Sequence, residues 1–117
     1  IADVNNEIYT LDNLIKDMNM DVILVARAGL GTINHTLLTV DYLKNRGIAI
    51  RGIIINGYED NKLCNDNIKM IKSMTSIPIL GIMPLINKES DKFLEDVKNV
   101  SEKIFEPKKI IECMKEI

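Results

Sequence analysis

The sequence lacks several features that mark particular classes of protein. Its 117 residues contain no Trp, three Tyr and two Phe, too few rings for the base-stacking surfaces of single-strand-binding proteins. The formal net charge of −2 also argues against a surface for duplex nucleic acid, because such surfaces need clustered Lys and Arg. No apolar run approaches the roughly 20 residues that span a bilayer. We therefore expect neither a nucleic-acid partner nor a membrane partner.

Residues suited to metal binding or redox chemistry are also scarce. The two cysteines, Cys64 and Cys113, match no metal-binding or redox spacing, and one histidine, His35, cannot form a zinc site alone. The first residues, IADVNNEIYT, lack the basic and apolar blocks of a secretion signal. Because this signal pattern is lacking and the two thiols are isolated in the sequence, we expect a reducing, cytoplasmic setting. No Gly-Lys-Ser/Thr occurs, so the sequence holds no phosphate loop of the G-x-x-x-x-G-K-[ST] form.

What the sequence does contain is an alternation of apolar strands and amphipathic helices. This order predicts an α/β fold, a parallel sheet with helices on both faces. Thr10 and Ser90 are expected N-caps, Gly47 an expected C-cap and Pro107 an expected helix start. We expect strands at 22–26, 48–56 and 77–84, and helices at 11–18, 32–46 and from 107 onward. Two more helices are expected, one through Ile68, Ile71 and Met74 and one that contains Phe93, Leu94 and Val97.

In such a sheet, ligands gather where the strands end. The loops RAGLGT at 27–32, NGYED at 56–60 and MPLINKES at 83–90 are therefore the candidate binding loops.

The glycine turn at 27–32 allows two interpretations. Gly31 and Thr32 open a helix whose free N–H groups can hold a carboxylate or a phosphate. The alternative, which the pattern alone favours, is a tight corner at which Thr32 caps its own helix. A dinucleotide fingerprint is weak here, because Asn34 stands where that motif needs glycine. Asn34 could orient a polar ligand or satisfy the helix end, and His35 is favoured as a structural or interface residue.

Asn56, at the end of the second apolar strand, also allows two interpretations. Its amide offers a donor and an acceptor side by side, which suits a purine edge. Asn-Gly is also a common turn pair, and the pattern alone favours the turn. The acidic residues that follow, Glu59, Asp60 and Asp66, are interpreted as solvated charges rather than metal ligands.

Taken together, these segments resemble dethiobiotin synthetases, the ATP-dependent cyclases of biotin synthesis. The resemblance covers nearly residues 1–98, and GLGTINHTLLT is its most specific part. The residues that carry it are DVILVARAGLGTINHTLLT at 21–39, RG at 46–47, RGIIING at 51–57 and GIMPLI at 81–86. It implies that residues 1–117 are the carboxyl-terminal half of one three-layer, P-loop NTPase-like domain. The phosphate loop, the catalytic lysines and the acidic Mg²⁺ ligands are implied to lie in an amino-terminal half that this sequence lacks.

The resemblance also implies an activity, the ATP- and Mg²⁺-dependent ring closure of 7,8-diaminononanoate with CO2 to dethiobiotin, by a homodimer. No catalytic or metal-ligating residue is implied within this chain, so we expect it to be inactive alone. The residues implied to bind adenine are Asn56, Gly57, Pro84, Leu85, Ile86 and Asp91. Those implied to hold the carboxylate of a substrate bound to the partner subunit are Leu30, Gly31, Thr32, Ile33 and Asn34.

Two other functions stay open. One is the ATPase domain of a cobyrinic or cobyric acid amide synthase, which shares this type of sheet. The other is a non-catalytic α/β module that dimerises through its glycine-headed helix.

Overall fold

A computed structural model describes residues 2–4, 7–86, 89 and 91–114. In it, the strands β3, β4 and β5 form one parallel sheet in that order, and a separate antiparallel hairpin pairs β1 with β2. The predicted α/β class is therefore confirmed. The elements in chain order are β1 (Ala2–Val4), β2 (Glu7–Tyr9), α1 (Leu11–Asp17), β3 (Val22–Arg27), α2 (Thr32–Asn45), β4 (Ile50–Tyr58), α3 (Lys62–Met74), β5 (Ile79–Pro84), α4 (Phe93–Ile104) and α5 (Pro107–Met114).

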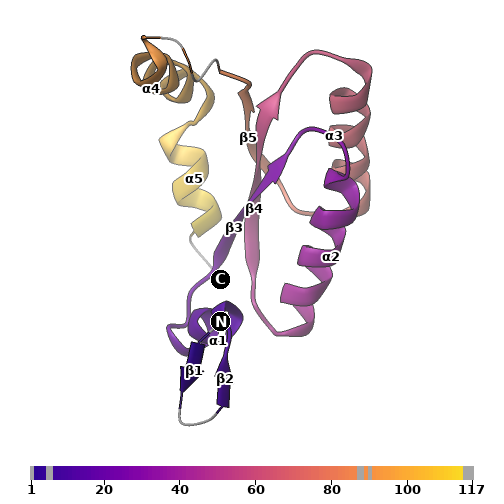
Figure 1. The fold of residues 1–117 in the computed structure, drawn as a ribbon, viewed down its shortest axis with the longest axis vertical. Coiled ribbons are helices and arrows are strands. Elements are labelled where there is room, and N and C mark those ends of the chain that lie inside the picture. The colour runs from indigo at the N-terminus through magenta and orange to yellow at the C-terminus, as the bar shows by residue number, and fades with distance from the viewer. Residues whose placement is uncertain (1, 5–6, 87–88, 90, 115–117) are drawn as a thin grey trace.

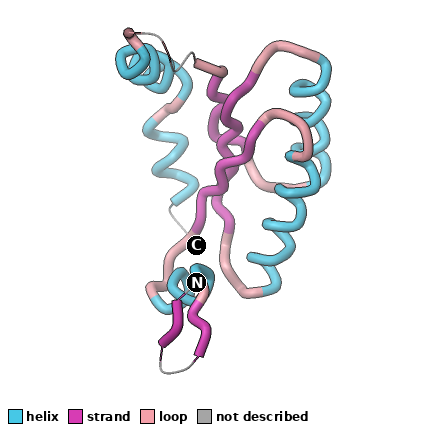
Figure 2. The backbone as a smooth tube through the Cα atoms, in the orientation of Figure 1, coloured by secondary structure: helices cyan, strands magenta, loops and turns pink. Residues whose placement is uncertain are grey.

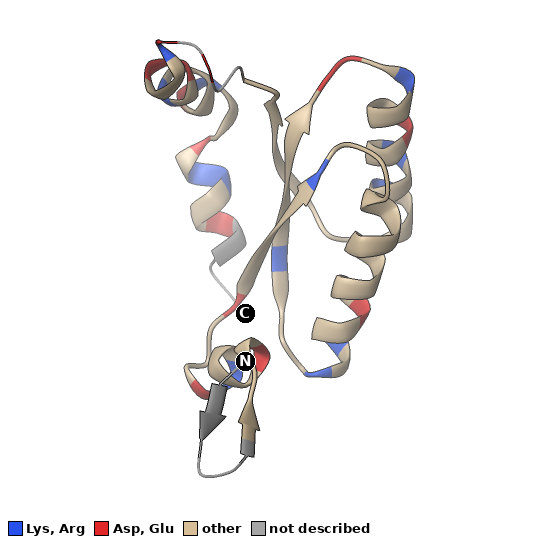
Figure 3. Cartoon of the chain, viewed as in Figure 1, with Lys and Arg blue, Asp and Glu red and all other residues tan. Residues whose placement is uncertain are grey.

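The helices cover both faces of the parallel sheet. Helices α2 and α3 lie on one face and α4 and α5 on the other, while the β1–β2 hairpin and α1 lie beyond one end of the strands (Figure 1). The connections between strands and helices lie at the two ends of the sheet (Figure 2). Charged residues are found mainly on the helices and loops, and the strands carry few (Figure 3). Parallel strands need this apolar character because helices cover them on both sides.

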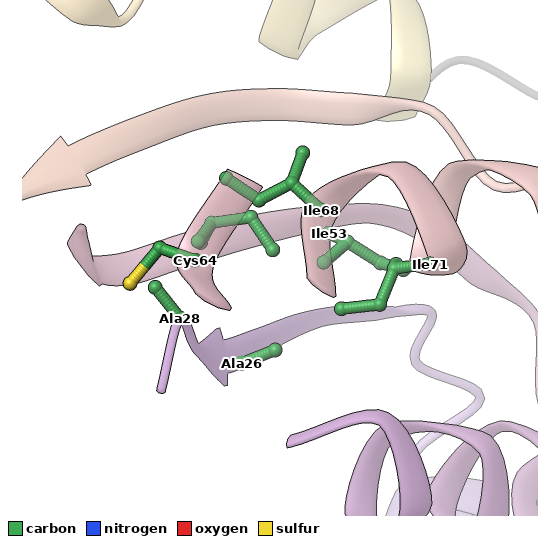
Figure 4. Close-up of a cluster of buried hydrophobic side chains, with 7 residues drawn as sticks. Ala26, Ala28, Ile53, Cys64, Ile68 and Ile71 are labelled. Atoms are coloured by element: carbon green, nitrogen blue, oxygen red, sulfur yellow. The ribbon is translucent and has the colours of Figure 1, made fainter. Parts of the chain in front are cut away.

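The core lies between the sheet and α3 (Figure 4). The α3 residues Cys64, Ile68 and Ile71 repeat at helical spacing, so their side chains point to one side, toward the sheet. Each is less than a tenth exposed, and Ile71 is fully buried. The complete buried cluster is Ala26, Ala28, Ile53, Ile55, Cys64, Ile68 and Ile71.

Glycines define both ends of α2. The N-cap is Gly31, with φ of +81°, so the interpretation in which Thr32 caps the helix is wrong. At the other end Gly47 has φ of +74°, and its N–H donates to Lys44 O while that of Ile48 donates to Leu43 O. This pair of bonds is a Schellman motif, which satisfies the last carbonyls of the helix. The C-cap is therefore Arg46, and the expected cap, Gly47, is the left-handed residue that follows it and ends the helix.

Two local predictions need correction, and one element was not predicted. The second sheet strand starts at Ile50 and runs through Asn56 to Tyr58, because Tyr58 pairs with Pro84 and its carbonyl accepts from the Leu85 N–H. The N-cap of α4 is Lys92, and the expected cap, Ser90, lies outside the described residues. The β1–β2 hairpin was not predicted.

Within the described residues, no helix combines the length and the apolar character needed to cross a membrane.

Candidate functional site

The carboxyl ends of the three parallel strands meet at one edge of the sheet. Arg27 at the end of β3 pairs in register with Asn56 of β4, and Asn56 pairs with Met83 of β5. A backbone bond of 2.9 Å from the Ala28 N–H to the Asn56 carbonyl extends this pairing beyond the end of β3. Two of the three predicted binding loops, the glycine turn and the region around Asn56, are therefore neighbours.

The glycine turn leads directly into the first turn of α2. Ala28 is buried, whereas the side chain of Leu30 is 90% exposed. Thr32, although at the helix start, is buried, and its Oγ1 lies 3.5 Å from Thr36 Oγ1, so its hydroxyl bonds within the helix. Four residues of this region, Arg27, Leu30, Thr32 and His35, line a cavity of about 400 Å³.

The first turn of α2 presents free backbone donors. Among the described residues, no hydrogen-bond acceptor is found for the amides of Ile33 and Asn34, as is usual in the first turn of a helix. The positive end of the helix dipole lies at the same place. Leu30 and Thr32 line the cavity, while Gly31, Ile33 and Asn34 belong to the same turn without lining it.

A second cavity, of about 270 Å³, lies where β4 and β5 end. Five of the six predicted adenine-binding residues line it; the sixth, Asp91, is exposed in the turn before α4 and does not. Gly57, with φ of +75°, produces an irregularity in the pairing between β4 and β5, after which Pro84 pairs with Tyr58. The complete lining is Asn56, Gly57, Met83, Pro84, Leu85, Ile86, Phe93 and Val97.

Helix α4 contributes a wall of this cavity that the sequence analysis did not predict. Phe93 and Val97, one helical turn apart, place a ring and a branched side chain beside the loop after β5. Asn56 supplies the polar amide of the cavity, and the remaining lining side chains are apolar. An apolar lining with one amide is chemically suited to a purine base, which needs stacking surface and a paired donor and acceptor.

The loop between β4 and α3, which follows Asn56 and Gly57 in the chain, is fixed by side-chain hydrogen bonds. Asn61 is the N-cap of α3, and its Oδ1 accepts from the Cys64 N–H at 2.8 Å. The Tyr58 hydroxyl donates to Asn65 Oδ1 at 2.7 Å and lies 3.3 Å from Asp60 Oδ1. Partial burial, followed by the nearby Asp60 carboxylate, raises the pKa of Tyr58, so the hydroxyl stays protonated and able to donate at neutral pH.

A buried amide on α3, missed in the sequence analysis, contacts the glycine turn. Asn67 is 7% exposed, and its Nδ2 lies 3.0 Å from Ala28 O and 2.8 Å from Gly29 O. The one signal in the sequence is that Asn67 falls on the same helical face as Cys64 and Ile71. A polar residue on an apolar face requires a hydrogen-bond partner.

Comparison with known proteins gives the same family as the sequence motifs. The profile of a family described as an AAA domain matches residues 2–92. The chain belongs to this AAA domain family. Over all 117 residues it is 63% identical to the ATP-dependent dethiobiotin synthetase of Clostridium acetobutylicum, covering 49% of that protein, and 47% identical to that of Clostridium kluyveri, covering 48%. Over 99 residues, 83% of this chain and 41% of the relative, it is 42% identical to that of Bacillus velezensis.

These matches confirm the resemblance to dethiobiotin synthetases that the motifs indicated. The chain spans about half the length of the curated relatives it matches. Across the described part of the chain, no group of three or more His, Cys, Asp or Glu residues is placed to hold a metal ion.

Proposed function

We propose that this chain is the carboxyl-terminal half of the catalytic domain of an ATP-dependent dethiobiotin synthetase. The observation that carries the proposal is 63% identity over the full chain to a protein of that name. The complete enzyme would close the ureido ring of dethiobiotin from 7,8-diaminononanoate, CO2 and ATP, in the cytoplasm. The phosphate loop and the Mg²⁺ ligands would come from sequence outside residues 1–117.

The surface of the chain supports its assignment as half of a domain. Its accessible surface is 8546 Å², against roughly 6,450 Å² for a compact monomer of this mass. Its radius of gyration is 16.2 Å, against about 13 Å for a compact domain of this length. Strand β3 pairs with β4 alone among the described strands, and Val25 at its centre is 60% exposed. An additional strand and its helices would cover this edge.

In this proposal the cavity between β4, β5 and α4 binds adenine. The Asn56 amide would pair with the purine edge, and Pro84, Leu85 and Ile86 would enclose the ring. The apolar lining of the cavity and the exposure of Asn56, which also lines it, support this role. Asp91, which does not line the cavity, would act only if the loop before α4 moved toward the base.

The turn from Leu30 to Asn34 would bind the carboxylate of diaminononanoate across a homodimer interface. The free amides of Ile33 and Asn34 and the dipole of α2 support an anion there. Arg27, which lines the neighbouring cavity, adds a positive charge at the same edge of the sheet. The ligand would be a carboxylate, because no Gly-Lys-Ser/Thr is present to hold a triphosphate.

The substitution Gly31→Asp in the complete enzyme tests the carboxylate assignment. A carboxylate fixed at the helix start would repel the substrate's own, so we expect KM for diaminononanoate to rise about tenfold or more, with KM for ATP changed less than twofold. Gly31→Asn is the matched control, because Asn has the same shape, tolerates positive φ and carries no charge. An added Cβ has room, since its nearest neighbour is His35 at 3.8 Å. An unchanged substrate KM in Gly31→Asp would contradict the assignment.

A further inference from the structure

The glycine turn is attached to α3 through a single buried amide. Asn67 Nδ2 lies 3.0 Å from the Ala28 carbonyl oxygen and 2.8 Å from that of Gly29. An amide nitrogen carries two N–H groups, so one side chain satisfies two consecutive carbonyls. Asn67 reaches the turn because it shares the inward side of α3 with Cys64 and Ile71, which pack on the sheet (Figure 4).

These two hydrogen bonds determine which way the peptide groups of the turn point. In a trans peptide the N–H lies opposite the C=O. With the carbonyls of Ala28 and Gly29 directed at α3, the amides of Gly29 and Leu30 are directed away from it. The Gly29 carbonyl also accepts from the Thr32 N–H at 3.4 Å, which connects the turn to the first residue of α2. The orientation of the helix start therefore depends on Asn67.

A replacement without an amide nitrogen does not reproduce this arrangement. Asp presents only acceptors to two carbonyl oxygens, and Leu offers no donor at all. A Ser hydroxyl offers one donor on a shorter side chain. Among the described residues, no other side chain donates to the carbonyls of Ala28 or Gly29. Loss of the Asn67 amide therefore leaves the buried Ala28 carbonyl without a side-chain donor and the Gly29 carbonyl with only the 3.4 Å bond from the Thr32 N–H.

We propose that Asn67 is the positioning residue of the carboxylate-binding turn. It holds residues 28–31 in the conformation that presents the start of α2 to the substrate, and it does not itself touch the substrate. This inference rests on the proposed function of that turn. Asn67 does not line the cavity at Asn56 and Phe93, so its loss acts on the acid substrate and not on the nucleotide.

Steady-state kinetics of the complete enzyme test this role. We expect Asn67→Leu and Asn67→Asp to raise KM for diaminononanoate about tenfold or more with KM for ATP within twofold, and Asn67→Ser to fall between them and the unchanged enzyme. Asp66→Leu is the matched control: Asp66 is the neighbouring residue on α3, it is exposed, and its carboxylate pairs with Lys62 instead of the turn. It should leave both KM values within twofold.

Hydrogen exchange of the turn provides a measurement that does not depend on activity. The amides of this region that are hydrogen-bonded, those of Ala28, Thr32 and His35, should exchange at least tenfold faster in Asn67→Ser than in the unchanged protein, with those of β4 unaffected. An unchanged substrate KM together with unchanged exchange would overturn the proposal, as would an equal rise in both KM values. A third outcome is faster exchange in Asn67→Ser, together with a KM for diaminononanoate that is unchanged in both Asn67→Ser and Gly31→Asp. This outcome would support Asn67 as the residue that orders the turn, and it would overturn the assignment of the turn as the carboxylate site.

Discussion

Single residues on α4 complete the cavity at the ends of β4 and β5. Phe93 is the aromatic residue among those that line it, and Val97 lies one turn further along the helix. A ring that packs on a purine contributes about 1–3 kcal/mol per base in proteins that stack bases. Phe93 therefore belongs with Asn56 among the residues that determine nucleotide affinity in the proposed function.

Replacing Phe93 tests this wall directly. In the complete enzyme, Phe93→Ala should raise KM for ATP about fivefold or more, because the base loses its stacking surface, and should leave KM for diaminononanoate nearly unchanged. Leu94→Ala is the matched control, since Leu94 is the next residue and 85% exposed. An ATP KM that stays the same in Phe93→Ala would show that the base does not contact this ring.

Asp12 connects α1 to the end of α2. Its carboxylate is buried, accepts a hydrogen bond from the Thr10 hydroxyl and lies 3.3 Å from Arg46 Nε. The hydrogen bond from Thr10 is the main cause that lowers the pKa of Asp12 below its ordinary 3.8. A hydrogen bond with Tyr42 and the charge of Arg46 lower the pKa further, whereas burial of the carboxylate opposes the shift. The lowered pKa means that the folded state favours the charged carboxylate.

The pH dependence of this contact has a defined sign. A lowered folded-state pKa contributes stability that is fully present above pH 3.8 and is lost as pH falls through the folded pKa, which lies below 3.8. Asp12→Asn should therefore lower the melting temperature by a few degrees at pH 7, and the difference should shrink as the pH falls below 3.8. A difference that is the same at pH 7 and pH 3 would contradict the role of the charge.

Which residues sequence reasoning could find depends on how far their partners lie along the chain. The roles expected of Asn56, Pro84 and the glycine turn followed from short motifs, and the structure brings those residues to one edge of the sheet. Asn67 was missed because its partners lie 39 and 38 residues away. Only the folded packing of α3 on β3 shows what that amide bonds.

At the scale of elements, the contact between β5 and the end of α4 requires a glycine. A Cβ at Gly81 would lie 2.5 Å from Phe105 Cε1 and 2.9 Å from Ile104 Cγ2. Real side chains do not approach so closely, so one of the elements would have to shift. Gly81 therefore permits α4 and the residue after it to pack against the sheet.

The substitution Gly81→Ala should destabilise the protein by about 1–3 kcal/mol, as overpacking of a core does. Urea denaturation measures this change. Combining it with Phe105→Leu removes part of the clash, so the double variant should lose less stability than the sum of the two single variants. Strict additivity would mean that Phe105 is not the group that the added methyl meets.

The sheet and its main helices could be predicted because each has a strong local pattern. The runs VILVA and GIII are continuous and apolar, and Gly47 and Pro107 mark a helix end and a helix start. The β1–β2 hairpin could not be predicted, because strands of three residues each are too short to show an apolar pattern. The extension of β4 to Tyr58 also depends on a partner strand, because pairing with β5 continues past the irregularity at Gly57.

At the scale of the whole molecule, much apolar surface is left uncovered. Val25 on β3, Leu30 in the glycine turn and Leu38 on α2 are 60%, 90% and 68% exposed. A sheet edge with such surface is a template for association with other chains.

The purified chain of residues 1–117 should therefore form no dethiobiotin from diaminononanoate, CO2, ATP and Mg²⁺, and light scattering should show it self-associated. Co-expression with the other half of the enzyme should restore ring closure and remove the aggregate. Ring closure by residues 1–117 alone would place the catalytic machinery within this chain and contradict the proposed division.

The bond between the Ala28 N–H and the Asn56 carbonyl has a consequence for the proposed homodimer. The turn after β3 would serve the partner's reaction centre, while Asn56 would serve the centre of its own subunit. A single 2.9 Å rung of the sheet would then hold parts of two reaction centres at a fixed spacing. The register between β3 and β4, rather than the sequence of the loops, would set the distance between the two reaction centres of the dimer.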